Sequence, residues 1–190
     1  MKRALRLLLA TGNPHKVEEL RAALPGFEIH AFAMSDTPPE NGATYFDNAR
    51  LKARHARGHA PADAWVVGED SGIEATALGG RPGIESARWA EDGVSALLAA
   101  LAQETDRRVR YVSELVVILP TGEELRGTGT LAGVVADAPR GTEGFGYDPI
   151  VIPLGESRTV AELGDAWKSE HSHRARAAQA LRAQLVTRDR

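Results

Sequence analysis

The 190-residue chain contains no cysteine, which excludes a disulfide scaffold, a thiolate zinc site and a cysteine nucleophile. It has no excess of positive charge: 23 lysines and arginines face 26 aspartates and glutamates, which argues against a stable nucleic-acid partner. No stretch approaches the ~20 apolar residues that a membrane span requires. The apolar run Leu7–Ala10 is too short for a signal peptide, so we expect a cytoplasmic protein without a membrane partner.

The composition, with 43% hydrophobic and 26% charged residues, is that of a globular protein of ordinary type. The length fits a single domain over residues 1–190. Helical patterns alternate with short apolar runs, and two strand-like segments at 109–119 and 124–135 flank a Pro-Thr-Gly-Glu turn. This order predicts an α/β fold with a mixed sheet rather than a purely parallel one.

Apolar spacing and capping residues predict the remaining elements. Thr44 with Asp47, and Thr159 with Glu162, have the spacing of capping boxes, and Ser172 is placed to cap the last helix. We expect strands at 5–10, 29–33, 65–68, 73–78 and 150–152, and helices after residue 13, at 44–57, at 94–103, after 159 and after 172.

The segment Thr11–Lys16, with the sequence TGNPHK, leads from a buried strand into a helix. Free backbone N–H groups and the helix dipole at such a point favour an anion such as phosphate. Lys16 falls in the first helical turn, where a cation opposes the dipole, and a phosphate ligand would explain its presence. The alternative is an ordinary strand–helix turn with a solvated lysine.

The segment GEDSG, residues 68–72, places Glu69 and Asp70 at the expected end of a strand, the edge where open α/β sheets bind ligands. Adjacent carboxylates repel each other, so they invite a hard cation such as Mg²⁺. Glu40 could add a further carboxylate, and Asn48 and Lys52 share one face of the following helix. The alternatives are a solvated acidic turn and a polar helix surface.

A third polar segment, EGFGYD at residues 143–148, carries two aromatic rings between glycines. Phe145 and Tyr147 suit stacking on a planar base, although both could equally belong to the core. Lys168, His173 and Arg174 follow as hydrogen-bond donors. Together the segments supply what a nucleoside triphosphate enzyme needs: a phosphate cradle, carboxylates for Mg²⁺, a base platform and convergent donors.

The order and the sequences of these motifs resemble those of the inosine/xanthosine triphosphate pyrophosphatases. The resemblance runs from about Leu7 to Leu185 and rests on five segments, LLLATGNPHKVEEL, ENGATYFDNARLKARHA, GEDSGIEATALGGRPGIESARWA, GTEGFGYDPI and KSEHSHRARA. It implies an elongated mixed β-sheet flanked by helices, with two lobes around a central cleft, and a homodimer. The implied reaction is Mg²⁺-dependent hydrolysis of ITP, dITP or XTP to the monophosphate and pyrophosphate.

Carried onto this sequence, the resemblance makes Asp70 the general base and, with Glu40, a Mg²⁺ ligand. Glu69, where the family often has Asp, is a further candidate ligand. The implied substrate-binding residues are Thr11, Gly12, Asn13, Pro14, His15, Lys16, Ser71, Phe145, Gly146, Tyr147, Asp148, Lys168, His173 and Arg174.

Two other interpretations remain open at this point. One is a related nucleotide pyrophosphatase with a different base preference, such as a modified pyrimidine. The other is a nucleotide- or RNA-binding module without turnover, against which Glu40, Asp70, Lys16 and the net charge of −3 argue.

Overall fold

The computed structural model describes residues 5–33, 36 and 38–188. Along the chain the main elements are β1 (Leu5–Ala10), α1 (Pro14–Ala23), β2 (Phe27–Ala31), α2 (Tyr45–His59), β3 (Trp65–Ala75), α3 (Gly93–Ala100), β4 (Arg108–Ile118), β5 (Glu124–Val135), β6 (Val151–Pro153), α4 (Val160–His171) and α5 (His173–Arg188). Three short 3₁₀ helices lie at Thr76–Leu78, Gly83–Glu85 and Asp148–Ile150.

The strands form one six-stranded sheet in the order β2-β1-β3-β4-β5-β6. The β1 strand pairs in parallel with β2 and β3, whereas the β3–β4, β4–β5 and β5–β6 pairs are antiparallel. The predicted mixed α/β sheet is therefore confirmed. In the described part of the chain no helix is long and apolar enough to cross a membrane.

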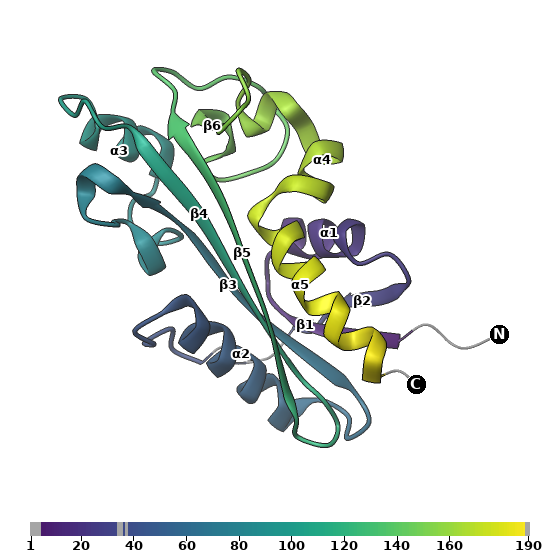
Figure 1. The fold of residues 1–190 in the computed structure, drawn as a ribbon. Coiled ribbons are helices and arrows are strands. Elements are labelled where there is room, and N and C mark those ends of the chain that lie inside the picture. Colours follow the sequence, from purple (N-terminus) through teal and green to yellow (C-terminus); the bar gives the residue numbers. More distant parts are fainter. Residues whose placement is uncertain (1–4, 34–35, 37, 189–190) are drawn as a thin grey trace.

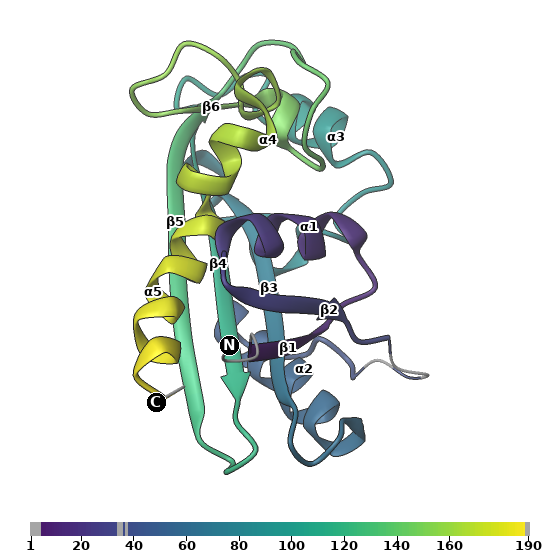
Figure 2. The same ribbon diagram turned by 90° about the vertical axis from the view of Figure 1, so that its right-hand side faces the viewer.

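Helices cover both faces of the sheet. In Figure 1, α2 lies on one side of the long strands, while α1, α4 and α5 lie on the other. The quarter turn in Figure 2 shows α1, α4 and α5 together on the face turned toward the viewer. The α2 helix packs through small residues, with Ala49 and Ala53 fully buried against β4.

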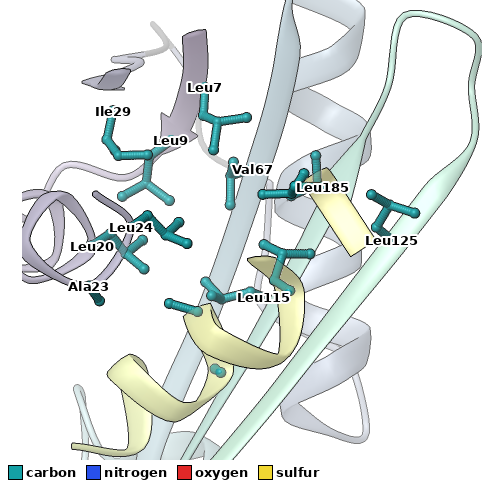
Figure 3. Packing of buried hydrophobic residues seen from close by; sticks show 14 of the residues in the cluster. Leu7, Leu9, Leu20, Ala23, Leu24, Ile29, Val67, Leu115, Leu125 and Leu185 are labelled. Atoms are coloured by element: carbon teal, nitrogen blue, oxygen red, sulfur yellow. The ribbon is translucent and has the colours of Figure 1, made fainter. Parts of the chain in front are cut away.

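Two separate hydrophobic cores share the long strands β3, β4 and β5. The first core joins leucines of β1, α1 and α5 to Val67 and Leu115, as Figure 3 shows. The second core lies toward the other end of the same strands and includes Ile73 and Tyr111, with Leu97 of α3 packed among them. The division into a single domain with two lobes stays a prediction.

Local sequence signals gave most element bounds to within a few residues. Both predicted capping boxes are present, and Ser172 accepts a hydrogen bond from the backbone N–H of Ala175 at 3.1 Å. The helix predicted at 94–103 is shorter, because α3 ends at Ala100 and the chain turns there. The strand predicted at 29–33 lies at Phe27–Ala31, and the strand predicted at 150–152 lies at Val151–Pro153.

The β3 strand is longer than the segment 65–68 that the sequence predicts as its first part. The sequence leaves open that residues 73–78 continue this strand, and the chain does stay extended from Trp65 to Ala75 before it enters a 3₁₀ helix. The polar residues remain extended because β4 pairs with β3 continuously from Val66 to Ala75.

Candidate active site

A polar band separates the two cores on the sheet face that α1 and α5 cover. Along β3, Glu69 and Ser71 lie between Val67 of the first core and Ile73 of the second. Since side chains alternate along a strand, these four residues share one face. Along β5, glycines occupy the corresponding stretch.

The glycines of β5 bring α5 into direct contact with the sheet. A Cβ atom at Gly127 would lie 2.3 Å from the carbonyl oxygen of Ala177, and one at Gly129 would lie 2.0 Å from that of His173. No side chain fits at either position, because both contacts are with helix backbone. The start of α5, which carries His173 and Arg174, is thereby fixed against the polar band.

Glu69 is the charged centre of this band. Its fully buried carboxylate forms an ion pair with the Lys16 ammonium, whose Nζ atom lies 2.6 Å from Oε2, and Oε1 accepts from Arg174 Nη2 at 3.0 Å. Burial alone would raise the pKa of Glu69, but the charges of Lys16 and Arg174 outweigh it and hold that pKa well below its ordinary value. Glu69 therefore carries its negative charge at all ordinary pH values.

Asp70, the next residue, points to the opposite face of the sheet. It accepts from the Lys52 ammonium at 3.0 Å and from Asn48 Nδ2 at 3.2 Å, both on α2. Because a continuous strand directs consecutive side chains apart, Glu69 and Asp70 bind different cationic side chains, and Glu69 as a further metal ligand stays a prediction.

Glu40 lies on the same side as Asp70. Its Oε1 atom accepts from Lys52 Nζ at 2.7 Å, so one ammonium group lies between the two carboxylates. Arg88, which sequence reasoning did not select, binds the other oxygen of Glu40 at 3.1 Å. The sequence groups Glu40 with Asp47, Asn48 and Lys52; the structure brings Glu40, Asn48 and Lys52 together with Asp70, whereas Asp47 belongs to the capping box of α2.

Burial raises the pKa of Asp70, and the negative charges of Glu69 and Glu40 act in the same direction against Lys52. Burial alone would lower the pKa of Lys52, but Asp70 and its carboxylate neighbours outweigh it and raise that pKa. Carboxylate oxygens are ligands that Mg²⁺ prefers, and those of Glu40 and Asp70 are held around one cation, the Lys52 ammonium. Glu40 and Asp70 therefore fit a Mg²⁺ ion.

The Thr11–Lys16 segment adopts the predicted strand–loop–helix geometry. Asn13 caps α1 by accepting from the backbone N–H of His15 at 2.9 Å, and Pro14 occupies the first turn. Lys16 lies in that turn as expected, and its partner within the chain is Glu69.

Asp148 organises the segment with the aromatic rings. It accepts from the Lys168 ammonium at 2.6 Å, from the Tyr111 hydroxyl at 3.1 Å and from the backbone N–H of Phe145 at 2.9 Å. Burial raises the pKa of Asp148, whereas Lys168 opposes that change. The ring of Phe145 is only half-buried and stacks on His15 with centroids 5.2 Å apart.

Tyr147 differs from Phe145 in its environment. Its ring belongs to the second core, and its hydroxyl donates to the carbonyl oxygen of Ser86 at 3.1 Å. Tyr147 therefore belongs to the core, as one of the two alternatives has it, whereas the half-buried Phe145 lines the cavity and its stacking on a base stays a prediction.

Glu19 joins the two cationic side chains of the C-terminal helices. Its carboxylate contacts Lys168 and Arg174, 149 and 155 residues away in the chain. Sequence reasoning missed Glu19, although its position three residues after Lys16 places both on one face of α1.

His173 lies flat against Tyr111, with ring centroids 4.6 Å apart and an interplanar angle of 8°. Burial lowers the pKa of His173 well below its ordinary value, and the charge of Arg174 acts in the same direction, so the ring is neutral. Its Nδ1 atom is buried, and no described residue forms a hydrogen bond to it.

Some of these side chains line a cavity of about 450 Å³, a size typical of small-molecule sites. Many of the predicted substrate-binding residues line it: Asn13, Lys16, Ser71, Phe145, Gly146, Tyr147, Asp148, Lys168, His173 and Arg174. The lining does not include Thr11, Gly12, Pro14, His15, Glu40, Glu69 or Asp70. Sequence reasoning missed Glu19, Tyr111, Ser86 and part of the segment at 87–94, which also line it.

Comparison with known proteins identifies the family. The sequence profile of the Ham1 family matches residues 7–184. The chain belongs to the Ham1 family. The dITP/XTP pyrophosphatase of Bdellovibrio bacteriovorus is 41% identical, covering 96% of this chain and 98% of the relative. That of Symbiobacterium thermophilum is 46% identical over 90% of each chain.

Solved structures of Ham1 proteins share the architecture. The Staphylococcus aureus Ham1 protein aligns with a TM-score of 0.84 at 32% identity, covering 96% of this chain and 99% of its own. A Mycobacterium abscessus structure, described as a nucleoside-triphosphatase / dITP/XTP pyrophosphatase, aligns with a TM-score of 0.72 at 38% identity, covering 93% and 98%. The mixed sheet with flanking helices is therefore that of the Ham1 family.

Proposed function

We propose that this Ham1 protein hydrolyses the deaminated purine nucleotides ITP, dITP and XTP to the nucleoside monophosphate and pyrophosphate, which would remove them from the nucleotide pool. The carrying observation is the cavity in which Lys16, Lys168, His173 and Arg174 converge beside the half-buried ring of Phe145. The names of the relatives, dITP/XTP pyrophosphatases, support the same reaction.

The base would stack on Phe145, and the hydrogen-bond donors around the base would discriminate between the different bases. Inosine and xanthosine carry an oxygen acceptor at the purine 6-position, whereas adenosine carries an amino donor. If adenine bound there, its 6-amino group would face a hydrogen-bond donor of the protein. Each group left unpaired in this way costs ~1–3 kcal/mol. Guanine also has a 6-oxo group, so its exclusion would depend on its 2-amino group.

The triphosphate would extend toward the end of β1. The β1 strand pairs with β3 only as far as Gly68, while β3 continues for seven more residues, of which Ile73 to Ala75 bond to the segment 81–86. The backbone N–H of Ile73 donates to Ser86 Oγ at 2.9 Å, on the side away from β4, so by alternation that of Ser71 points to the same side. The end of β1 and the stretch of β3 that extends past it form a notch in the sheet. Lys16 and the start of α1 border this notch and supply further hydrogen-bond donors for phosphate.

The notch also explains how one substrate could reach both faces of the sheet. Lys16 and Arg174 lie on one face, and Asp70 with Lys52 lies on the other. A chain of phosphates passing the edge of β3 between Gly68 and Ile73 would contact the first pair along its length and present its α-phosphorus to Asp70.

Asp70 would act as the general base. Water attacks the α-phosphorus, its proton passes to Asp70, and the bond from that phosphorus to the bridging oxygen of pyrophosphate breaks. Glu40 and Asp70 would hold the Mg²⁺ ion, which when bound would neutralise charge on the phosphate oxygens. Lys52, lying between the two carboxylates, would keep them in place.

A hydrolysis panel tests the proposal. ITP, dITP and XTP are compared with ATP, GTP, CTP and UTP in the presence of Mg²⁺, and the product is identified as pyrophosphate or orthophosphate. Asp70→Asn should lose nearly all turnover, while Asp137→Asn, at a fully exposed aspartate, should not. Pyrophosphate from the three deaminated nucleotides and little from the others is expected.

Other results would favour a different function. Preferred hydrolysis of a pyrimidine triphosphate would indicate a pyrophosphatase of another base class. Binding of ITP without any product would indicate a nucleotide-binding module.

We make three further proposals. The resemblance implies that the protein acts as a homodimer, and the sequence favours a location in the cytoplasm and no stable nucleic-acid partner. Sedimentation velocity over a tenfold concentration range tests the dimer, and a single species of monomer mass would contradict it.

A further inference from the structure

Two imidazole groups and one carboxylate gather at a place that the cavity does not include. His55 and His59, four residues apart on α2, present their rings to one another with centroids 4.6 Å apart. The Nε2 atoms of His55 and His59 lie 3.3 and 3.9 Å from the same oxygen, Oδ1 of Asp36. The ligand atoms of the three residues all lie within 4.8 Å of one another.

The ring of His59 is oriented as metal-binding histidines are. His59 Nδ1 lies 2.9 Å from the carbonyl oxygen of His55, so it donates there and leaves the lone pair of Nε2 facing Asp36. A bond from the second ring nitrogen to a backbone carbonyl is the usual way in which proteins orient such a ligand. The Nε2 atom of His55 is buried, and within the described residues nothing forms a hydrogen bond to it.

The spacing suits a shared ion better than direct contacts. A tetrahedral Zn²⁺ ion with bonds of about 2.0–2.2 Å sets its ligand atoms roughly 3.3–3.5 Å apart. The two Nε2–Oδ1 separations lie at or close to this range, whereas the longer one exceeds any hydrogen bond. Asp36 is mostly exposed, so an ion can enter from solvent.

We propose that Asp36, His55 and His59 form a binding site for a divalent transition-metal ion of the Zn²⁺ class. Two imidazole nitrogens select such ions over Mg²⁺, which prefers oxygen ligands, so this site would be chemically distinct from the Glu40–Asp70 carboxylates. The ion would tie Asp36, four residues before Glu40, to the helix that carries Lys52.

The test is metal binding by the untagged protein after treatment with a chelator. Equilibrium dialysis with Zn²⁺ should find one ion per chain, still bound at millimolar Mg²⁺. His59→Gln and His55→Gln should each weaken binding by roughly tenfold or more. His30→Gln is the matched control, because His30 is also half-exposed beside a single carboxylate, Glu28 at 3.8 Å.

Two further measurements separate ligand loss from misfolding. Zn²⁺ should raise the melting temperature of the wild type and of His30→Gln but not of His59→Gln, while the metal-free proteins should melt alike. Co²⁺ in place of Zn²⁺ should give the visible absorption of a tetrahedral site in the same two proteins only. Absent stoichiometric Zn²⁺ binding, full binding by both His55→Gln and His59→Gln, or loss of binding in Asp70→Asn alone would each overturn the proposal.

Discussion

Replacing Glu69 by glutamine should destabilise the protein strongly, because it removes the charge that lies between two cations. Its carboxylate is fully buried and binds Lys16 at 2.6 Å and Arg174 at 3.0 Å. Breaking a buried ion pair from one side costs about 3–5 kcal/mol. Glutamine keeps one acceptor oxygen, and Glu19 still neutralises part of the charge of Arg174, so we expect about 3 kcal/mol.

The assay is thermal unfolding followed by circular dichroism. At about 2–4 °C per kcal/mol for a domain of this size, the melting temperature should fall by about 6–12 °C. Glu114→Gln is the matched control, since Glu114 is an equally buried glutamate of the same sheet. Its partner Arg126 is half-exposed, and such a pair contributes about 0–1 kcal/mol, so the change there should stay below about 4 °C.

The pH dependence adds an independent check. The pKa of Glu69 is lowered on folding, so its stabilisation is complete above the pKa of 4.5 of the unfolded carboxyl and is lost as the pH falls below that value. The difference between wild type and Glu69→Gln should therefore shrink in acid. Equal losses for Glu69→Gln and Glu114→Gln, or a difference that stays constant down to about pH 3, would refute the reasoning.

Three other changes have defined outcomes. Because burial raises the pKa of Asp70, kcat should fall as the pH drops through that raised pKa, and a flat acid limb in a pH–rate profile would argue against Asp70 as the base. Gly129→Ala should cost about 2 kcal/mol or more in urea unfolding, because its Cβ would lie 2.0 Å from the His173 carbonyl oxygen. Gly58→Ala, in open space on α2, should instead stabilise by about 0.5–1 kcal/mol, and equal effects would contradict this assignment. Phe145→Ala should raise KM for every accepted base alike, since stacking does not distinguish the 6-position, and a rise for one base only would contradict stacking.

The sequence predicts what is decided within a few residues. The capping boxes at Thr44 and Thr159 and the helix start after Asn13 follow from side chains that bond to nearby backbone. The grouping of Asn48 with Lys52 follows from helical spacing, and their contact with Asp70 is then a matter of one helix packing on one strand.

Contacts between distant segments could not be read in the same way. The polar stretch Glu69–Gly72 looks like a turn, and only its continuous pairing with β4 keeps it extended and sends Glu69 and Asp70 to opposite faces. The hydrogen bond between Glu19 and Arg174 joins residues that are 155 positions apart, so no local sequence pattern predicts it.

The continuity of the long strands limits how the site can move. The β3–β4 pairing runs unbroken from Val66 to Ala75, and the β4–β5 pairing from Arg108 to Ile118, so the same backbone ladders pass through both cores. Changing the distance between the cores would require bending or twisting these ladders, because no flexible linker joins them there. The stiffness of the sheet therefore limits how far the width of the cavity can change. Adjustment to a substrate is left to what lies beside the sheet, above all the segment at 86–94 and the half-buried ring of Phe145.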